Sequence, residues 1–439
     1  MFSIVSKEYL VGELIPAVYY PNRMHSMRCS SHDLALLLTV LAIGLLVDFD
    51  LGLEIEVAQL YIRLAWSTAL LPALPTIATV KCLHLMNIYH GMAGDKYDSH
   101  RLLISAWQCL HYIKLHEDPD IKAIKNEEAY DRRAYFWNLL QPILWQSLMT
   151  GILPSVLETP HECYVLSEQD EKDYDKREAV GFGAWSSKFT YQCLRPVTIA
   201  VIDPNPPDYK HILALDERIR TFPIPSSSPN SSDLPSIMQH FIYSHYREHV
   251  LMFLHRDSFK QTLTDNPMDP LTSTRGYSFT TTYESACVVL DSTINLYAKA
   301  KYHVPKIWRI WANAFCATVD DVLRRRRIVA HHIFGNCFQV VIGAVAVLTP
   351  NVKLEPCPLR KLEDACALFE VKASCASSAL PKVLETFDSA LRSAGQVVPM
   401  RHVTHLTADL QGDNIVFEDT WSVRLYEEVM QAAQAHISD

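Results

Sequence analysis

The chain has 439 residues, of which 49% are hydrophobic and 20% charged, and its 40 basic and 49 acidic side chains give a formal net charge of −9. The apolar content excludes wholesale disorder and collagen-like or low-complexity classes. The acidic balance excludes the basic surface that is typical of nucleic-acid-binding domains. The 13 glycines are fewer than half of average usage, whereas phosphate-binding loops and turn-dense β folds need more of them. We therefore expect a mostly helical protein.

From residue 31 onward, apolar side chains recur at helical spacing. This pattern predicts five successive helices, at 34–47, 54–70, 76–89, 97–115 and 126–150. Ser30 or Ser31 can cap the first helix and Asn126 the last, which Gly151 and Pro154 end.

A dense charged segment at 168–178 predicts a solvated loop between the first helices and those that follow. Four prolines and six serines at 223–236 predict a linker. Further helices are expected at 185–202, 211–222, 237–254, 279–300, 307–348, 359–373 and 379–393.

No run of residues alternates as a strand does, so the predicted fold is an all-α, multihelical bundle of two tightly associated halves. The expected parts are an N-terminal segment (1–30), a middle helical domain (31–222), the linker (223–236), a C-terminal helical half (237–398) and an acidic tail (399–439).

The cysteines indicate the redox compartment of the protein, and the longest uncharged stretch indicates whether it could span a membrane. The 11 cysteines lie at least nine positions apart, so the chain has no CxxC pair for zinc or redox chemistry. We interpret them as reduced, buried thiols of an intracellular protein. The stretch 328–349 follows four arginines, as a membrane span with a positive-inside flank does, but His331, His332 and Asn336 interrupt it. We therefore expect no membrane partner, and a membrane-associated helical protein stays an alternative.

The common catalytic signatures are missing from the sequence: nucleophile elbows (GxSxG), Walker loops and HExxH motifs do not occur. His255-Arg256-Asp257 has three letters of a kinase catalytic loop, but Thr262 stands where the metal-binding asparagine should follow. His111 and His116 are five positions apart on a predicted helix, so they should point away from one another and share no metal. We predict no enzyme activity, and no catalytic residue, cofactor or metal site in this chain.

Eight phrases in chain order carry a resemblance. The four within residues 76–157 are Thr79-Val80-Lys81-Cys82-Leu83 beside "TVQAL", Trp107 with Ile113-Lys114-Leu115-His116-Glu117-Asp118 beside "lGLHRD", Arg132-Arg133-Ala134-Tyr135-Phe136-Trp137 beside "RRRvFW", and Gln146-Ser147-Leu148 with Gly151 and Pro154 beside "qSL..GRPPS". Four more follow at 183–194, 215–223, 254–270 and 362–369. In this order they resemble the fungal-specific transcription factor domain, the middle homology region of fungal binuclear zinc-cluster regulators.

The resemblance implies the regulatory domain of a fungal nuclear transcription factor, a helical scaffold that regulates DNA-templated transcription and is not a catalyst. It points to ten positions as family-motif residues with a structural or regulatory role: Trp107, His116, Asp118, Arg132, Arg133, Trp137, Gln146, Ser147, Gly151 and Pro154. From their chemistry alone, Arg132 and Arg133 should pair with acids on neighbouring helices or face water rather than DNA. Trp107, Trp137 and Trp145 should pack in the core rather than line an inducer pocket.

Family members bind zinc and DNA through N-terminal cysteines spaced C-x2-C-x6-C twice. The first 81 residues here hold one cysteine, Cys29, and no basic cluster. We therefore expect zinc and direct DNA contacts only from a module that is missing from this chain. The partners that the resemblance implies are homo- or heterodimeric relatives, and a small-molecule inducer of unknown identity stays open.

Three further alternatives concern the role of the chain and its charged segments. A DNA-binding-deficient helical protein that heterodimerises with related regulators is the second functional hypothesis. Seven acids against one base between Asp409 and Asp439 fit an acidic activation segment or an ordinary surface helix. Arg324–Arg327 fit a nuclear-localisation signal or an inserted loop.

Overall fold

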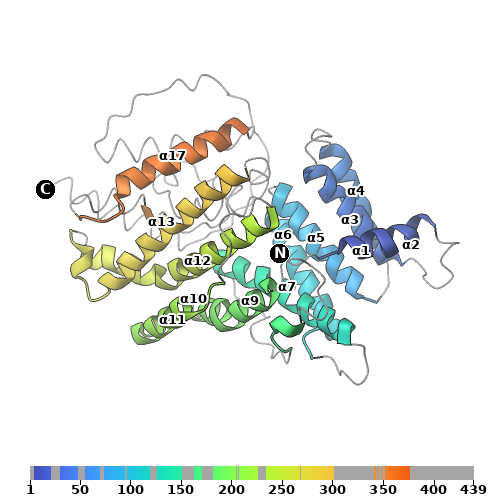
Figure 1. The fold of residues 1–439 in the computed structure, drawn as a ribbon, viewed down its shortest axis with the longest axis horizontal. Coiled ribbons are helices and arrows are strands. Elements are labelled where there is room, and N and C mark those ends of the chain that lie inside the picture. Colours follow the sequence, from blue (N-terminus) through green and yellow to red (C-terminus); the bar gives the residue numbers. More distant parts are fainter. Residues whose placement is uncertain are drawn as a thin grey trace. The chain divides into compact units, whose positions relative to one another are not determined.

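The computed structural model in Figure 1 describes most of the chain up to Cys375. The described residues are 4–20, 30–47, 55–69, 74–93, 96–118, 126–150, 163–170, 181–225 except 204 and 206, 234–300 except 267, then 341, 342, 345, 349 and 352–375. These residues form helices joined by turns, and no β-strand occurs among them. The predicted all-α, multihelical fold class is therefore confirmed.

The chain divides into two compact units, Met1–Tyr243 with Lys299–Arg309 and Ser244–Ala298 with Ile310–Asp439. The division falls inside helix α12 (Leu234–Asp265) and not in the segment at 223–236 that predicts a linker. Pro235 is the second residue of α12. A proline is tolerated there, because the first N–H groups of a helix have no intrahelical acceptor.

The first unit consists of short and medium helices. They are α1 (Lys7–Tyr9), α2 (Ile15–Tyr19), α3 (Ser31–Val47), α4 (Ile55–Ala69), α5 (Ile77–Ala93), α6 (Lys96–Tyr112), α7 (Asn126–Thr150), α9 (Phe182–Phe189), α10 (Arg195–Ile202), α11 (Tyr209–Thr221) and the start of α12. Helix α3 packs against α4 and α5, and α5 packs against α6. Buried alanines allow this close approach: Ala42 of α3 and Ala58 and Ala65 of α4 are fully buried.

Ser30 caps α3 as the sequence predicts. Ser30 Oγ accepts the amide of Asp33, and Asp33 Oδ2 accepts the amide of Ser30, at 3.1 and 3.0 Å. These reciprocal bonds form a capping box at the start of α3. Helix α7 spans Asn126–Thr150, in agreement with the helix predicted at 126–150, and Asn126 is its first helical residue rather than a cap.

The helix predicted at 185–202 is continuous but changes its winding halfway. Residues Thr190–Leu194 form a π-helical turn between α9 and α10, and Pro196 is the second residue after it. A second π turn, Leu10–Leu14, precedes Pro16 in the same way. At both places the residue before the proline donates its N–H five positions back, Arg195 to Thr190 and Ile15 to Leu10. The proline that follows has no N–H to donate to the residue four positions earlier.

Aromatic side chains around Trp185 form a large part of the core of the first unit. The Trp185 ring stacks on Phe189 with 5.1 Å between ring centroids and meets Tyr243 edge-on at 4.6 Å. Its Nε1–H donates to the carbonyl of Pro223 at 2.9 Å. Because the indole N–H has a partner, this large side chain is buried without an unsatisfied polar group.

In the second unit, α12 and α13 (Gly276–Lys299) share a row of buried hydrogen bonds. His255 Nδ1 lies 2.9 Å from Ser278 Oγ, and His245 Nδ1 lies 3.0 Å from Ser292 Oγ. Between these pairs, Ser285 Oγ donates to Glu248 Oε2 at 3.0 Å. Because sliding one helix along the other breaks several of these bonds together, the row specifies the register of the two helices. Helix α17 (Pro358–Cys375) confirms the helix predicted at 359–373.

Acid should destabilise the second unit through His245. Complete burial lowers the pKa of this imidazole from 6.5 to about 3. In this pH range the unfolded chain binds a proton at His245 that the folded chain does not bind. The free energy of unfolding therefore decreases as the pH falls from about 6.5 towards 3. Lowering the pH from 7.5 to 5 should cost about 2 kcal/mol at this residue alone. We expect urea unfolding of His245→Gln to lose that much less on acidification than wild type. His211→Gln, on an exposed residue of α11, should leave the pH dependence unchanged; an unchanged dependence in His245→Gln contradicts this assignment.

Several predicted features lie outside the described residues. They include the helix at 379–393, most of the one at 307–348, the arginines 324–327, Gly151, Pro154 and the tail at 399–439. Within the part of the chain that is described, none of the helices combines the length and apolar character that crossing a bilayer requires.

Candidate functional site

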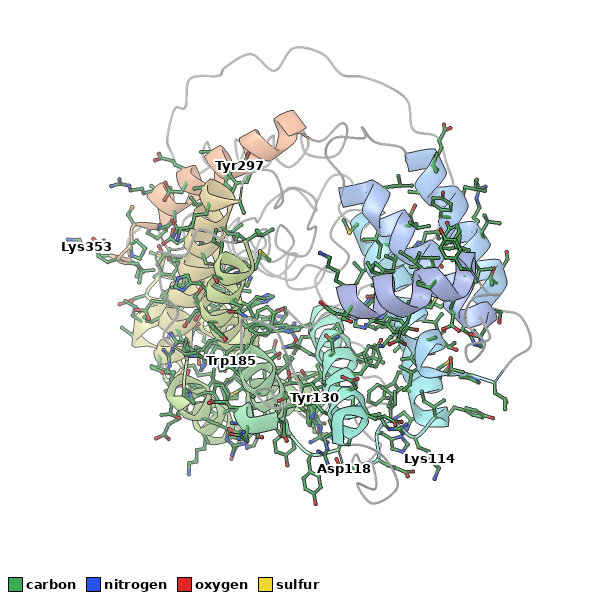
Figure 2. The ribbon with its side chains drawn as sticks, turned by 45° about the vertical axis from the view of Figure 1, so that its right-hand side comes forward. Lys114, Asp118, Tyr130, Trp185, Tyr297 and Lys353 are labelled. Atoms are coloured by element: carbon green, nitrogen blue, oxygen red, sulfur yellow. The ribbon has the colours of Figure 1, made fainter. Side chains whose placement is uncertain are left out.

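The end of α6 is the first part of the candidate site. The amide of Leu115 donates to the carbonyl of Leu110 and the amide of Lys114 to that of His111, both at 3.0 Å. This pair of bonds is a Schellman motif, which reverses the chain at a helix C-terminus and needs a left-handed residue. Lys114 is that residue, with a φ of 59°. The helix expected to reach residue 115 therefore ends at Tyr112, and the turn carries Lys114 and Asp118 (Figure 2).

The turn corrects the prediction that His111 and His116 point apart. Their ring centroids are 4.0 Å from each other, with 34° between the ring planes. The prediction assumed that both residues belong to one regular helix. Because Lys114 takes a left-handed conformation, the chain folds back and brings His116 over His111.

Arg132 of α7 contacts the same turn. Its Nη2 donates to the carbonyl oxygens of Ile113 and Lys114, at 3.4 and 3.5 Å. The last carbonyl oxygens of a helix carry partial negative charge, and no N–H group of the same helix donates to them. The Arg132 guanidinium therefore stabilises the end of α6 from the neighbouring helix.

Arg133, the next residue, forms a two-bond ion pair with Asp118. Nε donates to Oδ1 and Nη2 to Oδ2, each at 2.7 Å, and both side chains are about five-sixths buried, with 16% and 15% exposed. Hydrogen bonding to Asp118 raises the pKa of Arg133. Asp118 Oδ1 also accepts the backbone amide of Tyr164 at 3.3 Å. The carboxylate thus joins α7 to the segment 163–166.

Trp137 lies one turn further along α7 and contacts the same segment. Its Nε1–H donates to the carbonyl of Tyr164 at 2.9 Å, and its side chain is 1% exposed. The ring meets Phe136 and Tyr191 edge-on, with centroids 5.2 and 6.1 Å away. Arg133 lies over the ring of Tyr164 at 5.8 Å. We call Asp118, Arg132, Arg133, Trp137 and Tyr164 the α6–α7 cluster.

The other family-motif residues that the structure describes make packing contacts or local hydrogen bonds. Trp107 is 4% exposed and packs on Phe136 and His111, with centroids 5.9 and 4.9 Å away. Ser147 donates to the carbonyl of Ile143 in its own helix. Gln146 lies beside His100, whose pKa burial lowers. Burial of Trp107, Trp137 and Trp145 confirms that these indoles pack in the core.

The cluster offers positioning rather than reactive groups. The polar atoms of Asp118, Arg133 and Trp137 bind one another or the backbone of Tyr164. Burial raises the pKa of the nearby Cys163 thiol to about 12, so it stays protonated at neutral pH and is a poor nucleophile or metal ligand. Among the described residues, no three histidine, cysteine, aspartate or glutamate side chains converge to hold a metal ion.

Two members of the site were missed from the sequence. Tyr164 acts through its backbone, which no residue type encodes. Lys114 occupies a left-handed position without being glycine, and the only signal for it was the glycine of the phrase "lGLHRD". Comparisons with protein-family models, with curated proteins and with solved structures found no match to this chain.

Replacing Lys114 by glycine should stabilise the protein. A residue with a Cβ pays a free-energy penalty at a φ of 59°, which glycine avoids. Allowing for the greater freedom of glycine in the unfolded chain, we expect Lys114→Gly to raise the free energy of unfolding by about 0.5–1 kcal/mol. Both substitutions remove the exposed ion pair between Lys114 and Glu117. Lys114→Ala keeps the strained backbone, so urea unfolding should show no increase in its free energy of unfolding. Equal stabilities of the two variants contradict this explanation.

Proposed function

We propose that this chain is the regulatory domain of a fungal nuclear transcription factor of the zinc-cluster family. It acts in the nucleus on DNA-templated transcription without catalysing a reaction. Zinc and DNA contacts come from a separate module, and dimeric relatives are its expected protein partners. The proposal rests on the phrases that resemble the fungal-specific transcription factor domain and on the contacts between their residues.

The pairing of Asp118 with Arg133 is the observation that carries the proposal. Asp118 is the last letter of the phrase beside "lGLHRD" and Arg133 belongs to the phrase beside "RRRvFW". The two side chains share two hydrogen bonds of 2.7 Å. If the two phrases matched by chance, we would not expect the two residues of one ion pair to come from them.

The position of Lys114 supports the proposal independently. It stands where the phrase "lGLHRD" has glycine, and its φ of 59° is a conformation that glycine adopts without strain. The similarity of letters thus coincides with a backbone requirement at the end of α6.

Mechanistically, the α6–α7 cluster joins three stretches of the first unit: the turn 113–118, helix α7 and the segment 163–166. Stretches of chain that are joined by short hydrogen bonds and a buried indole move as one body. A partner or inducer that shifts one of these stretches therefore shifts the others, which is what a regulatory scaffold has to do.

A tethering experiment in a fungal host tests the function. The chain is fused to a heterologous DNA-binding domain and the transcription of a matching reporter is compared with that given by the DNA-binding domain alone. We expect the fusion to raise or lower transcription several-fold and Arg133→Met to weaken that effect. Arg63→Met, on an exposed residue of α4, is the matched control and should behave as wild type.

A stable, nuclear fusion that leaves transcription unchanged contradicts the proposal. If the chain instead reduces the output of a full-length zinc-cluster regulator with which it co-purifies, and shifts no DNA itself, the interaction-protein hypothesis replaces it.

A further inference from the structure

The histidine pair at the end of α6 has a feature that the α6–α7 cluster does not use. His111 Nε2 and His116 Nδ1 are both buried, and neither makes a hydrogen bond within the described part of the chain. The ring centroids are 4.0 Å apart with 34° between the ring planes, and Trp107 meets His111 in an edge arrangement with centroids 4.9 Å apart. Two neutral imidazoles pack well in this way, whereas two imidazolium ions at the same distance repel one another.

The charges around the pair are of both signs. On the turn itself, Glu117 Oε1 lies 3.8 Å from His116 Nε2 but also pairs with Lys114 at 3.3 Å. From α7, Arg132 adds a positive charge at the carbonyls of Ile113 and Lys114. Arg133 is neutralised by Asp118. Glu117 is thus shared between His116 and Lys114, and burial is the main factor that opposes protonation of His111.

We propose that the contact between His111 and His116 makes the end of α6 a proton-sensitive switch, which is closed while His111 is neutral and opens when His111 takes up a proton. The inference goes beyond the proposed function and holds whether or not the chain regulates transcription. In the closed state the contact between the two rings fixes both ends of the turn 111–116. When His111 takes up a proton this contact is lost, and the turn that carries the acceptors of Arg132 opens.

The direction of the pH dependence follows from His111. Burial, and then the charge of His116, lower the pKa of this imidazole. The open turn therefore binds protons more readily than the closed one, and its population rises as the pH falls below about 6.5, the ordinary value for histidine. Asp118 lies two residues after His116, so opening also loosens its contacts with α7.

Hydrogen exchange at two amides tests the switch in the full-length protein. The amides of Lys114 and Leu115 donate the two bonds that close the turn. After correction for the intrinsic exchange rate, we expect their protection to fall about tenfold between pH 7.5 and pH 5.5. Amides in the middle of α7 report global unfolding, and the two turn amides should exchange faster than these at both pH values, as local opening requires.

Two variants make the result specific. His111→Phe keeps an aromatic ring in contact with Trp107 and His116 but cannot be protonated, and His116→Gln removes the second imidazole. Protection of Leu115 should become independent of pH in His111→Phe and less dependent on pH in His116→Gln, because burial of His111 remains there. His211→Gln on exposed α11 should respond as wild type. Constant protection of Leu115 in the wild type, or an undiminished loss in His111→Phe, overturns the proposal. If His116→Gln does not fold, His111→Phe alone decides.

Discussion

Replacing Trp137 by alanine should lower the free energy of unfolding by about 3–5 kcal/mol, the largest effect that we expect from a single substitution. The indole is 1% exposed and is among the largest fully buried side chains. Its removal leaves a cavity beside Phe136 and also leaves the carbonyl of Tyr164 without its donor. Urea unfolding followed by far-ultraviolet circular dichroism measures the change.

Two controls separate packing from hydrogen bonding at Trp137. Trp137→Phe keeps most of the ring but cannot donate to Tyr164, so its cost should be about 1–3 kcal/mol. Tyr112→Ala removes an aromatic ring that is 60% exposed, and its effect should stay within about 0.5 kcal/mol. A loss below about 1 kcal/mol in Trp137→Ala is incompatible with the packing described here.

Replacing Arg133 by methionine should cost about 2–4 kcal/mol, the second-largest effect. Methionine retains much of the buried stem but leaves the Asp118 carboxylate without the cation that binds both of its oxygens. A carboxylate that is 15% exposed is only partly solvated, so the loss exceeds that of a surface ion pair.

Arg132→Met is the matched control, because it removes the neighbouring arginine of the same helix. The Arg132 contacts with the turn are long, at 3.4 and 3.5 Å. We expect a cost of about 0.5–1.5 kcal/mol for this variant. If Arg132→Met proves as destabilising as Arg133→Met, the ion pair with Asp118 is not the source of the difference.

The sequence was sufficient for features that depend on neighbours in the chain. The apolar spacing predicted the helical class, and Asn126 together with Gly151 and Pro154 predicted both ends of α7. The end of α6 could not be predicted in the same way. Ile113 and Leu115 continue the apolar pattern, and lysine is a good helix former. Nothing local indicates that Lys114 leaves the helix with a positive φ.

Contacts in the α6–α7 cluster depend on the tertiary fold. That Arg133 should pair with an acid could be expected from its chemistry, and the structure confirms it, although the acid lies on a turn and not on a neighbouring helix. The bonds from Asp118 and Trp137 to Tyr164 use only its backbone N–H and C=O. Since every residue type offers these groups, sequence alone could not single out Tyr164.

A double-mutant cycle between Arg133 and Asp118 tests most directly whether the two phrases meet in one ion pair. The free energy of unfolding is measured for wild type, Arg133→Met, Asp118→Asn and the double variant under the same conditions. The pairing predicts that the double variant loses about 1.5–3 kcal/mol less than the sum of the two single losses. The reason is that the second substitution no longer leaves a buried charge without its partner. Losses that add within about 0.5 kcal/mol contradict it, and the family resemblance then loses the contact on which it rests.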